Sequence, residues 1–213
     1  MRQTNILPAS EEAIAKGAQL LCAGRLVVFP TDTVYGVGTD LANETAVDDL
    51  FEAKGRSVEK AIPLLIASPD YLALVAESVS SAALRLTARY WPGGLTIIVR
   101  KNARVPDIVT GGKPTVAVRM PDHPVAIRLI AAAGGAIAAT SANKSGEPSP
   151  VTAQEAAAQL DGRVDLIIDG GRSPGRIASS IVDLTSAAPR LLRAGAIPLE
   201  ELEEAMGAHF ERL

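Results

Sequence analysis

Apolar residues along the chain follow two spacings, one typical of helices and the other of short buried strands. Segments with apolar positions three or four residues apart, opened by Ser, Asn, Thr or Pro, predict helices at 10–21, 43–55, 81–90, 124–133 and 152–160, with others opening near 69 and 198. Apolar runs bounded by turn residues predict strands at 26–29, 62–67, 95–100, 115–120, 136–140, 164–168, 179–184 and 190–193. The elements alternate without a regular β-α-β rhythm, and the last two strands have hairpin spacing. We therefore expect an α/β fold with a mixed, twisted, open sheet flanked by helices.

Length and composition favour one domain spanning residues 1–213, with its core at about 10–200. The 213 residues are 47% hydrophobic but only 3% aromatic, so Ala, Val, Leu and Ile must fill the core. The net charge of −3 argues against a protein that coats nucleic acid through bulk electrostatics, although a local basic groove is compatible with it. The polar N-terminus does not resemble a signal peptide, and no apolar run approaches the roughly 18 residues of a membrane span. These features predict a cytoplasmic protein that does not enter membranes.

The single cysteine and two histidines limit the possible chemistry. Cys22 has no partner for an intrachain disulfide, and its place on the predicted apolar side of the first helix indicates a small buried hydrophobe. His123 stands in a helix-opening turn, and neither histidine has another His or Cys beside it, so we expect no protein-bound metal. No Gly-x-Ser-x-Gly is present, and Ser141 has no visible paired base.

The densest group of polar residues is Phe29–Gly38, which follows a buried strand. It contains two threonines, an aspartate, a tyrosine and two glycines. Loops at strand ends are where α/β proteins place binding groups, so we expect a ligand site here. Four later stretches also put cations or hydroxyls at the ends of predicted elements, at 54–60, 115–119, 140–143 and 191–195.

These cations are the candidates for holding a polyanion. The chain has neither the glycine-rich phosphate loop nor the dinucleotide fingerprint, so nucleotide phosphates would have to be met by side chains. Guanidinium and ammonium groups suit phosphate and carboxylate oxygens. For each cation taken alone, the alternative is an ordinary solvated surface charge. The candidates are Lys54, Arg56, Lys60, Arg119 and Arg193.

The segment 144–150 is the most loop-like internal stretch. Its Ser, Gly and Pro content, and its position directly after Ser141-Ala142-Asn143, predict a mobile cover over the site.

Several ordered motifs together resemble the YrdC/TsaC-type threonylcarbamoyl-AMP synthases, in register from about residue 10 to 200. They are Pro30-Thr31-Asp32-Thr33-Val34-Tyr35-Gly36, the pairs Lys54-x-Arg56 and Ser141-x-Asn143, and the stretches 179–183 and 192–195. The resemblance implies a nucleotidyltransferase that converts L-threonine, bicarbonate and ATP, with its Mg²⁺, into L-threonylcarbamoyladenylate and pyrophosphate. It also implies a basic concave cleft. The family's longer members carry a further C-terminal domain, and this chain is expected to be the single-domain form.

The resemblance also implies roles for individual residues. Residues matched to L-threonine binding are Thr33, Arg119, Ala139 and Ser179. Those matched to ATP are Arg56, Lys60, Thr115, Ser141, Ser149 and Arg193. The two signature pairs imply catalytic roles for Lys54, Arg56, Ser141 and Asn143. The family's basic loop usually reads Lys-x-Arg-Pro-x-x-Lys-Pro, whereas this chain has Ser57 and Ala61 in place of the prolines.

The product would feed the modification of an adenosine beside the anticodon of certain tRNAs. The resemblance therefore implies downstream threonylcarbamoyl-transfer proteins and a weak contact with tRNA as partners. Two alternatives stay open from the sequence. One is a non-catalytic RNA-binding module that uses the same basic groove, and the other is a carbamoyl-nucleotide enzyme with a different acceptor, as in hydrogenase maturation.

Overall fold

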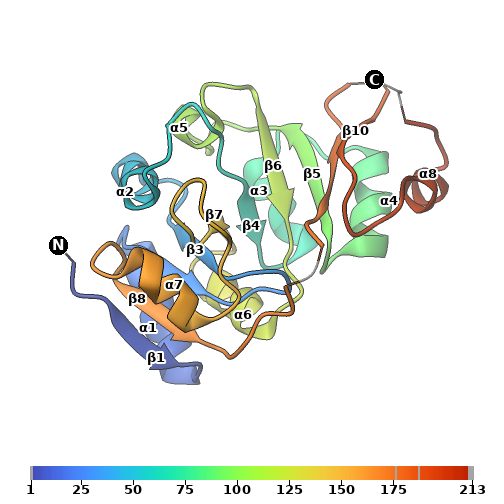
Figure 1. The fold of residues 1–213 in the computed structure, drawn as a ribbon. Helices are drawn as coiled ribbons and strands as arrows, with labels where there is room; N and C mark the ends of the chain where they lie inside the picture. The colour runs from blue at the N-terminus through green and yellow to red at the C-terminus, as the bar shows by residue number, and fades with distance from the viewer. Residues whose placement is uncertain (1, 176, 187, 211–213) are drawn as a thin grey trace.

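A mixed sheet of ten described strands runs through the molecule (Figure 1). The computed structural model describes residues 2–175, 177–186 and 188–210. The order across the sheet is β1-β8-β2-β3-β7-β4-β6-β5-β9-β10, with parallel pairs (β1/β8, β2/β8, β4/β6, β5/β9) interspersed among antiparallel ones. The strands are β1 Asn5–Pro8, β2 Val27–Phe29, β3 Gly36–Thr39, β4 Leu64–Ile66, β5 Leu95–Arg100, β6 Thr115–Arg119, β7 Ala136–Ser141, β8 Leu166–Asp169, β9 Ser180–Asp183 and β10 Arg190–Arg193.

Helices cover both faces of the sheet, but one face only in part. They are α1 Glu11–Cys22, α2 Glu44–Lys54, η1 Pro69–Tyr71, α3 Leu72–Val75, α4 Ser81–Tyr90, α5 Asp107–Thr110, α6 Pro124–Ala132, α7 Ala153–Leu160 and α8 Leu199–Met206. The larger core lies between the sheet and α2, α4, α7 and α8. The smaller core joins α1 and α6 to alternate residues of β2, β7 and β8. The buried core around α1 and α6 includes no described residue of β6, β5 or β9, and side chains of these three strands line a cavity instead.

The fold class expected from the sequence is confirmed, including the antiparallel hairpin of β9 and β10. Two strands were missed. Gly36–Thr39 was interpreted as part of a turn, but it forms β3 between β2 and β7. Glycine is used here for close packing, because a Cβ atom added at Gly38 would lie 3.0 Å from the Ala138 carbonyl oxygen. The other missed strand is β1, a short edge strand without an apolar run.

The prediction that Cys22 is buried is wrong, since its side chain is exposed. The buried face of α1 runs through Ile14, Ala18 and Leu21. Cys22 is the last residue of the helix and is rotated by about 100° from Leu21, which turns it away from the sheet.

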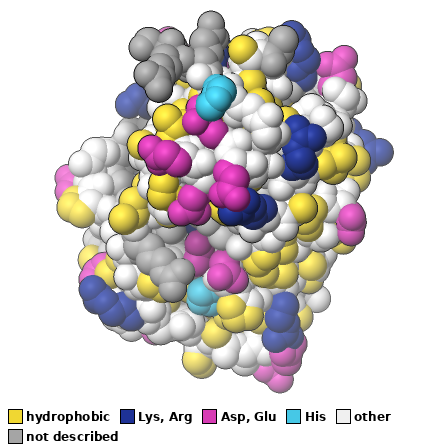
Figure 2. Space-filling view, turned by 90° about the vertical axis from the view of Figure 1, so that its right-hand side faces the viewer, with side chains coloured by type: hydrophobic (Ala, Val, Ile, Leu, Met, Phe, Trp, Pro, Cys, Tyr) yellow, Lys and Arg dark blue, Asp and Glu magenta, His cyan; other side chains and the backbone are white. Residues whose placement is uncertain are grey.

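The face that carries α4 and α8 is not uniformly basic (Figure 2). Acidic side chains gather there among scattered Lys, Arg and hydrophobic ones. Helix α8, which lies on this side of the molecule in Figure 1, carries four glutamates in the sequence Leu-Glu-Glu-Leu-Glu-Glu. No helix in the described part of the chain is long and apolar enough to cross a membrane.

Candidate active site

A cavity of about 530 Å³ lies on the part of the sheet that α1 and α6 leave uncovered. Its walls come from the turn before β3, the loop after α2, and the strands β4, β5, β6, β7, β9 and β10, segments that meet only in the folded chain (Figure 1). Its lining includes Thr31, Thr33, Arg56, Thr96, Ala117, Arg119, Ala139, Ser141, Ser149, Ser179 and Arg193.

The threonine-rich turn is held by its own side chains. Thr31 Oγ1 donates to the Val34 carbonyl at 2.6 Å and accepts from the backbone N–H groups of Thr33 and Val34 at 3.2 and 3.3 Å. The Thr33 hydroxyl lies 3.1 Å from that of Thr31. Thr31 is therefore occupied in shaping the turn, and Thr33 is presented at the cavity wall, where the sequence predicted a binding residue.

Arg119, at the end of β6, is held in a fixed orientation beside this turn. One terminal nitrogen, Nη2, donates to Asp32 Oδ2 at 2.6 Å, and Nε donates to the Gly93 carbonyl at 2.9 Å. The other terminal nitrogen, Nη1, lies 3.4 Å from Thr33 Oγ1, a long contact. The Asp32 carboxylate is nearly buried and also accepts from the Asp122 N–H at 3.2 Å. The strongest contacts of the guanidinium are thus made by Nε and Nη2, and Nη1 is the weakly held donor.

Arg193 and Ser179 form a second group in the same cavity. Arg193 Nε donates to the Ser179 carbonyl at 2.8 Å and Nη2 to its hydroxyl at 2.9 Å. The same hydroxyl lies 2.7 Å from Thr96 Oγ1. Burial lowers the pKa of Arg193, and the nearby positive charge of Arg119 lowers it further. The two guanidinium groups therefore repel each other, and an anion bound between them would offset this repulsion.

Lys54 lies beneath the cavity rather than on its wall. Its side chain is only 2% exposed, and its ammonium donates to the carbonyls of Ser141 and Asn143 and, at 3.3 Å, to Asn143 Oδ1. Asn143 Oδ1 accepts from the Ser141 hydroxyl, and Asn143 Nδ2 donates to the carbonyls of Lys144 and Glu147. Lys54 and Asn143 therefore shape the turn that presents Ser141, and all their contacts are within the protein. Burial, and then the charge of Arg56, lower the pKa of Lys54 to about 8.

The remaining residues predicted from the sequence divide into two groups. Arg56, Ala139 and Ser149 line the cavity together with Ser141. Lys60 is exposed and outside the lining, and its carbonyl accepts a long 3.4 Å contact from Arg56 Nε. Thr115 begins β6 opposite Arg100, at the other end of the strand from Arg119, and is also outside the lining.

Thr96 is a lining residue that the sequence reasoning missed. It lies on β5, directly opposite Arg119 on β6. The available signal was a single hydroxyl within the apolar run 95–99 that follows Gly93-Gly94. Asp32 was noticed in the turn, but its pairing with Arg119 was not anticipated, because the two residues are 87 positions apart.

The charge of the cavity is its most informative property. Three arginines line it, whereas its lining in the described part of the chain contains no aspartate or glutamate. Arg119 forms an ion pair with Asp32, but no ion pair is found for Arg56 or Arg193 among the described residues. A site of this kind suits an anionic ligand.

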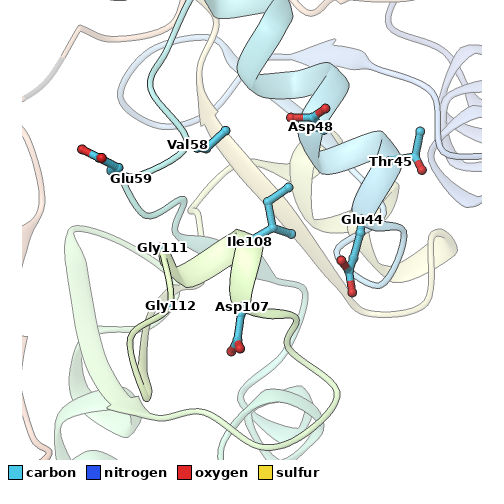
Figure 3. Close-up of a pocket in the computed structure, with 9 residues that line it drawn as sticks. All are labelled: Glu44, Thr45, Asp48, Val58, Glu59, Asp107, Ile108, Gly111 and Gly112. Atoms are coloured by element: carbon cyan, nitrogen blue, oxygen red, sulfur yellow. The ribbon is translucent and has the colours of Figure 1, made fainter.

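A second hollow, of about 690 Å³, has the opposite character (Figure 3). It lies between α2, α5 and the loop after α2, and its ionisable groups are four carboxylates, of Glu44, Asp48, Glu59 and Asp107. Figure 3 shows the Glu59 and Asp107 side chains pointing in different directions. This hollow does not suit a nucleotide. Within the described residues, no group of three or more His, Cys, Asp or Glu side chains is arranged to hold a metal ion.

Comparison with known proteins adds independent evidence. The family model Sua5_yciO_yrdC, described as telomere recombination, matches residues 19–195. A threonylcarbamoyl-AMP synthase of Pyrococcus abyssi is 44% identical over 197 residues, which cover 92% of this chain and 58% of that protein. A protein of Mycobacterium tuberculosis named putative threonylcarbamoyl-AMP synthase is 40% identical over 185 residues, covering 87% of this chain and 85% of that protein.

The solved structures agree with the sequence comparisons. The crystal structure of Pyrococcus abyssi Sua5 complexed with L-threonine superposes with a TM-score of 0.90 at 41% identity, covering 99% of this chain and 62% of that one. The chain thus spans less than two thirds of the length of its Pyrococcus abyssi relatives.

Proposed function

Because the chain belongs to the Sua5/YciO/YrdC family, we propose that it is an L-threonylcarbamoyladenylate synthase. It would form L-threonylcarbamoyladenylate and pyrophosphate from L-threonine, bicarbonate and ATP. The observation that carries the proposal is the cavity lined by three arginines and several hydroxyls, with no carboxylate in its described lining. Both substrates bring negative charge to the reaction, and such a cavity can hold them next to each other.

The chemistry needs positioning more than it needs a nucleophile from the protein. The threonine amine and CO₂, derived from bicarbonate, form a carbamate. A carbamate oxygen then attacks the α-phosphorus of ATP, forming a new P–O bond as the bond to pyrophosphate breaks. Aligning two reactants in this way can supply about 7–11 kcal/mol of the barrier. The arginines would also stabilise negative charge on the phosphoryl oxygens.

The two sides of the cavity suit the two substrates. Arg119, Thr33 and Ser179 would hold L-threonine, since Arg119 Nη1 is weakly held and faces the Thr33 hydroxyl. Arg56 and Ser141 would contact ATP. Arg193 donates to the Ser179 hydroxyl and is close to the positive charge of Arg119, so it would lie between the two substrates and contact both. Mg²⁺ would arrive with the triphosphate, coordinated mainly by phosphate oxygens and water.

Lys60 and Thr115, which the resemblance matches to ATP, are outside the cavity lining. Lys60 lies on the exposed loop that follows α2 and would reach the triphosphate only through a rearrangement of that loop. The replacement of the usual prolines by Ser57 and Ala61 removes two constraints on the loop.

The labile product would pass to threonylcarbamoyl-transfer proteins that modify tRNA in the cytoplasm. A weak tRNA contact fits a local basic cavity better than it fits the acidic face around α8.

The direct test is pyrophosphate release from MgATP, with and without L-threonine and bicarbonate. We expect release to require both, and L-serine to replace L-threonine poorly. Release that does not depend on threonine would contradict the proposal. RNA binding with a steep salt dependence but no ATP cleavage would support an RNA-binding module instead.

A second prediction concerns the exposed loop 144–150. Three hydrogen bonds hold this loop. Asn143 Nδ2 donates to the Glu147 carbonyl at 2.7 Å, Gln159 Nε2 donates to the Pro148 carbonyl at 3.0 Å, and the Tyr35 N–H donates to the Pro150 carbonyl at 2.8 Å. Its tip reaches the cavity through Ser149. A cover here would protect the acyl-phosphate anhydride from water. We expect hydrogen exchange of this loop to slow when MgATP and L-threonine are both present.

The matched control for that measurement is the loop 111–114, which is also exposed but contributes no residue to the cavity lining. Its exchange should not respond to the ligands. If loop 144–150 exchanges equally with and without the ligands, it is a surface loop and not a cover.

A further inference from the structure

We propose that Thr96 helps to bind the carboxylate of L-threonine. Its hydroxyl, which is hydrogen-bonded to that of Ser179, would fix the direction of the O–H group that this pair donates to the ligand. The inference rests on the proposed function, because it concerns the substrate that the cavity binds. It assigns a role to a strand residue that lies outside every motif carrying the family resemblance.

Thr96 is placed at the centre of the site by the register of the sheet. β5 lies between β6 and β9, and Thr96 is directly opposite Arg119 on one side and Ile181 on the other. Side chains of directly opposed residues share a face of the sheet. Thr96 therefore stands beside Arg119 on the cavity face, where it is 5% exposed and lines the cavity.

The hydrogen-bond donors in this group can be counted. A guanidinium only donates, so the Ser179 oxygen is the acceptor in the 2.9 Å contact from Arg193 Nη2. Between Ser179 Oγ and Thr96 Oγ1, 2.7 Å apart, one of the two hydroxyl hydrogens is used. The other hydrogen has no acceptor among the described residues. The pair thus presents one oriented O–H donor beside two guanidinium groups.

A carboxylate is the ligand that this arrangement fits. It has two oxygens that accept hydrogen bonds and one negative charge, which matches an O–H donor flanked by Arg119 and Arg193. Without the Thr96 hydroxyl, Ser179 could rotate its hydrogen away from the ligand. Binding would then lose the advantage of an orientation set in advance, although both arginines would remain.

The test is calorimetric titration of L-threonine and of L-threoninamide, whose carboxylate is replaced by a neutral amide. Thr96→Val removes the hydroxyl and keeps the branched shape. We expect it to raise the Kd for L-threonine by about threefold to tenfold, the range of one hydrogen bond, and to raise the Kd for L-threoninamide by less, because a hydrogen bond to a charged carboxylate is roughly twice as strong as one to a neutral amide carbonyl. Thr96→Ser should restore most of the affinity for L-threonine.

Thr39→Val is the matched control. Thr39 is a buried strand threonine whose hydroxyl donates to the Arg25 carbonyl at 3.2 Å, and it is outside the cavity lining. Its replacement should change neither Kd. If Thr96→Val fails to fold, Thr96→Ala is measured in its place.

Three results would overturn the inference. Unchanged L-threonine affinity in Thr96→Val would show that the hydroxyl does not contribute. Equal losses for the acid and the amide would show that Thr96 only supports the local packing. Both results leave the proposed function intact if the wild-type protein binds L-threonine. A wild-type protein that does not bind L-threonine would overturn the inference and the proposed function together.

Discussion

Replacing Arg119 by alanine is expected to raise the L-threonine concentration needed for half-maximal pyrophosphate release by at least about thirtyfold. Truncating one partner of a buried, hydrogen-bonded charge pair costs about 2–5 kcal/mol, and each 1.4 kcal/mol is about a factor of ten. Two losses combine in this variant. The substrate carboxylate loses its guanidinium, and the nearly buried Asp32 carboxylate is left without its 2.6 Å ion pair. An uncompensated negative charge next to the site would itself repel the substrate.

The measurement is initial-rate kinetics with L-threonine varied at saturating MgATP. Arg190→Ala is the matched control, because Arg190 also pairs with a mostly buried aspartate, Asp183, at 3.0 Å, but lies outside the cavity lining. It should lower stability without a selective change in the threonine requirement. An Arg119→Ala variant with the wild-type threonine requirement would place the carboxylate site elsewhere in the cavity.

Asp32 provides a further check on this assignment. Asp32→Asn keeps a hydrogen-bond acceptor for Arg119 and removes the neighbouring negative charge. If the loss of L-threonine affinity in Arg119→Ala comes partly from the unpaired Asp32 carboxylate, the double variant Arg119→Ala/Asp32→Asn should bind L-threonine better than Arg119→Ala alone. This comparison separates repulsion by Asp32 from the loss of the guanidinium.

The sequence predicted the fold class well because local signals and tertiary packing agree in most elements. The capping residues Ser10 and Asn43 accept from backbone N–H groups where they were expected to. The strand Gly36–Thr39 was missed because its formation depends on tertiary contacts. Gly36–Thr39 is glycine-rich and polar at its ends, and it becomes a strand because β2 and β7 supply hydrogen bonds on both sides.

The sequence predicted part of the cavity lining, but it missed Thr96 and included Lys60 and Thr115, which are outside the lining. Short motifs identified Arg119, Ser141, Ser179 and Arg193, which the fold brings to one cavity. Nothing in the order of residues shows which charges face the ligand and which are used within the protein. Lys54 was expected to be one of the cations that meet a ligand, yet its contacts are to backbone and side-chain oxygens of a turn 87 or more positions away. Burial and pairing depend on the assembled sheet, so this distinction required the structure.

The second large effect is expected for Lys54→Met, which keeps the length of the side chain and removes its donors. The carbonyls of Ser141 and Asn143 would lose a donor, at about 1–3 kcal/mol for each buried acceptor left unsatisfied, whereas Asn143 Oδ1 would keep its bond from the Ser141 hydroxyl. Relief of the desolvated charge offsets part of this loss. We expect a moderate fall in stability and a fall in kcat/KM of at least about tenfold, because the turn that presents Ser141 is no longer fixed.

Lys101→Met is the matched control for that variant. Lys101 Nζ donates to the Val105 carbonyl at 2.6 Å and pairs with Asp107 at 2.9 Å, away from the cavity. It should lower the melting temperature without a comparable loss of kcat/KM. If Lys54→Met retains wild-type kcat/KM, the turn does not depend on the ammonium, and Lys54 has no role in positioning.

The pH dependence of the wild-type protein tests the same role of Lys54 by removing its charge instead of its side chain. With its pKa lowered from 10.5 to about 8, the amine is charged below pH 8 and neutral above it. A neutral amine has two hydrogens for three acceptors, so kcat/KM should decline as the pH rises through about 8.

In the unfolded chain the lysine keeps its proton up to about pH 10.4. Between these values the unfolded state binds more protons, and the contribution of this group to stability therefore rises with pH. Activity that falls while the contribution of Lys54 to the free energy of unfolding increases would distinguish a loosened turn from general alkaline unfolding. A kcat/KM profile that is flat from pH 7 to 9.5 would contradict the role assigned to the Lys54 charge.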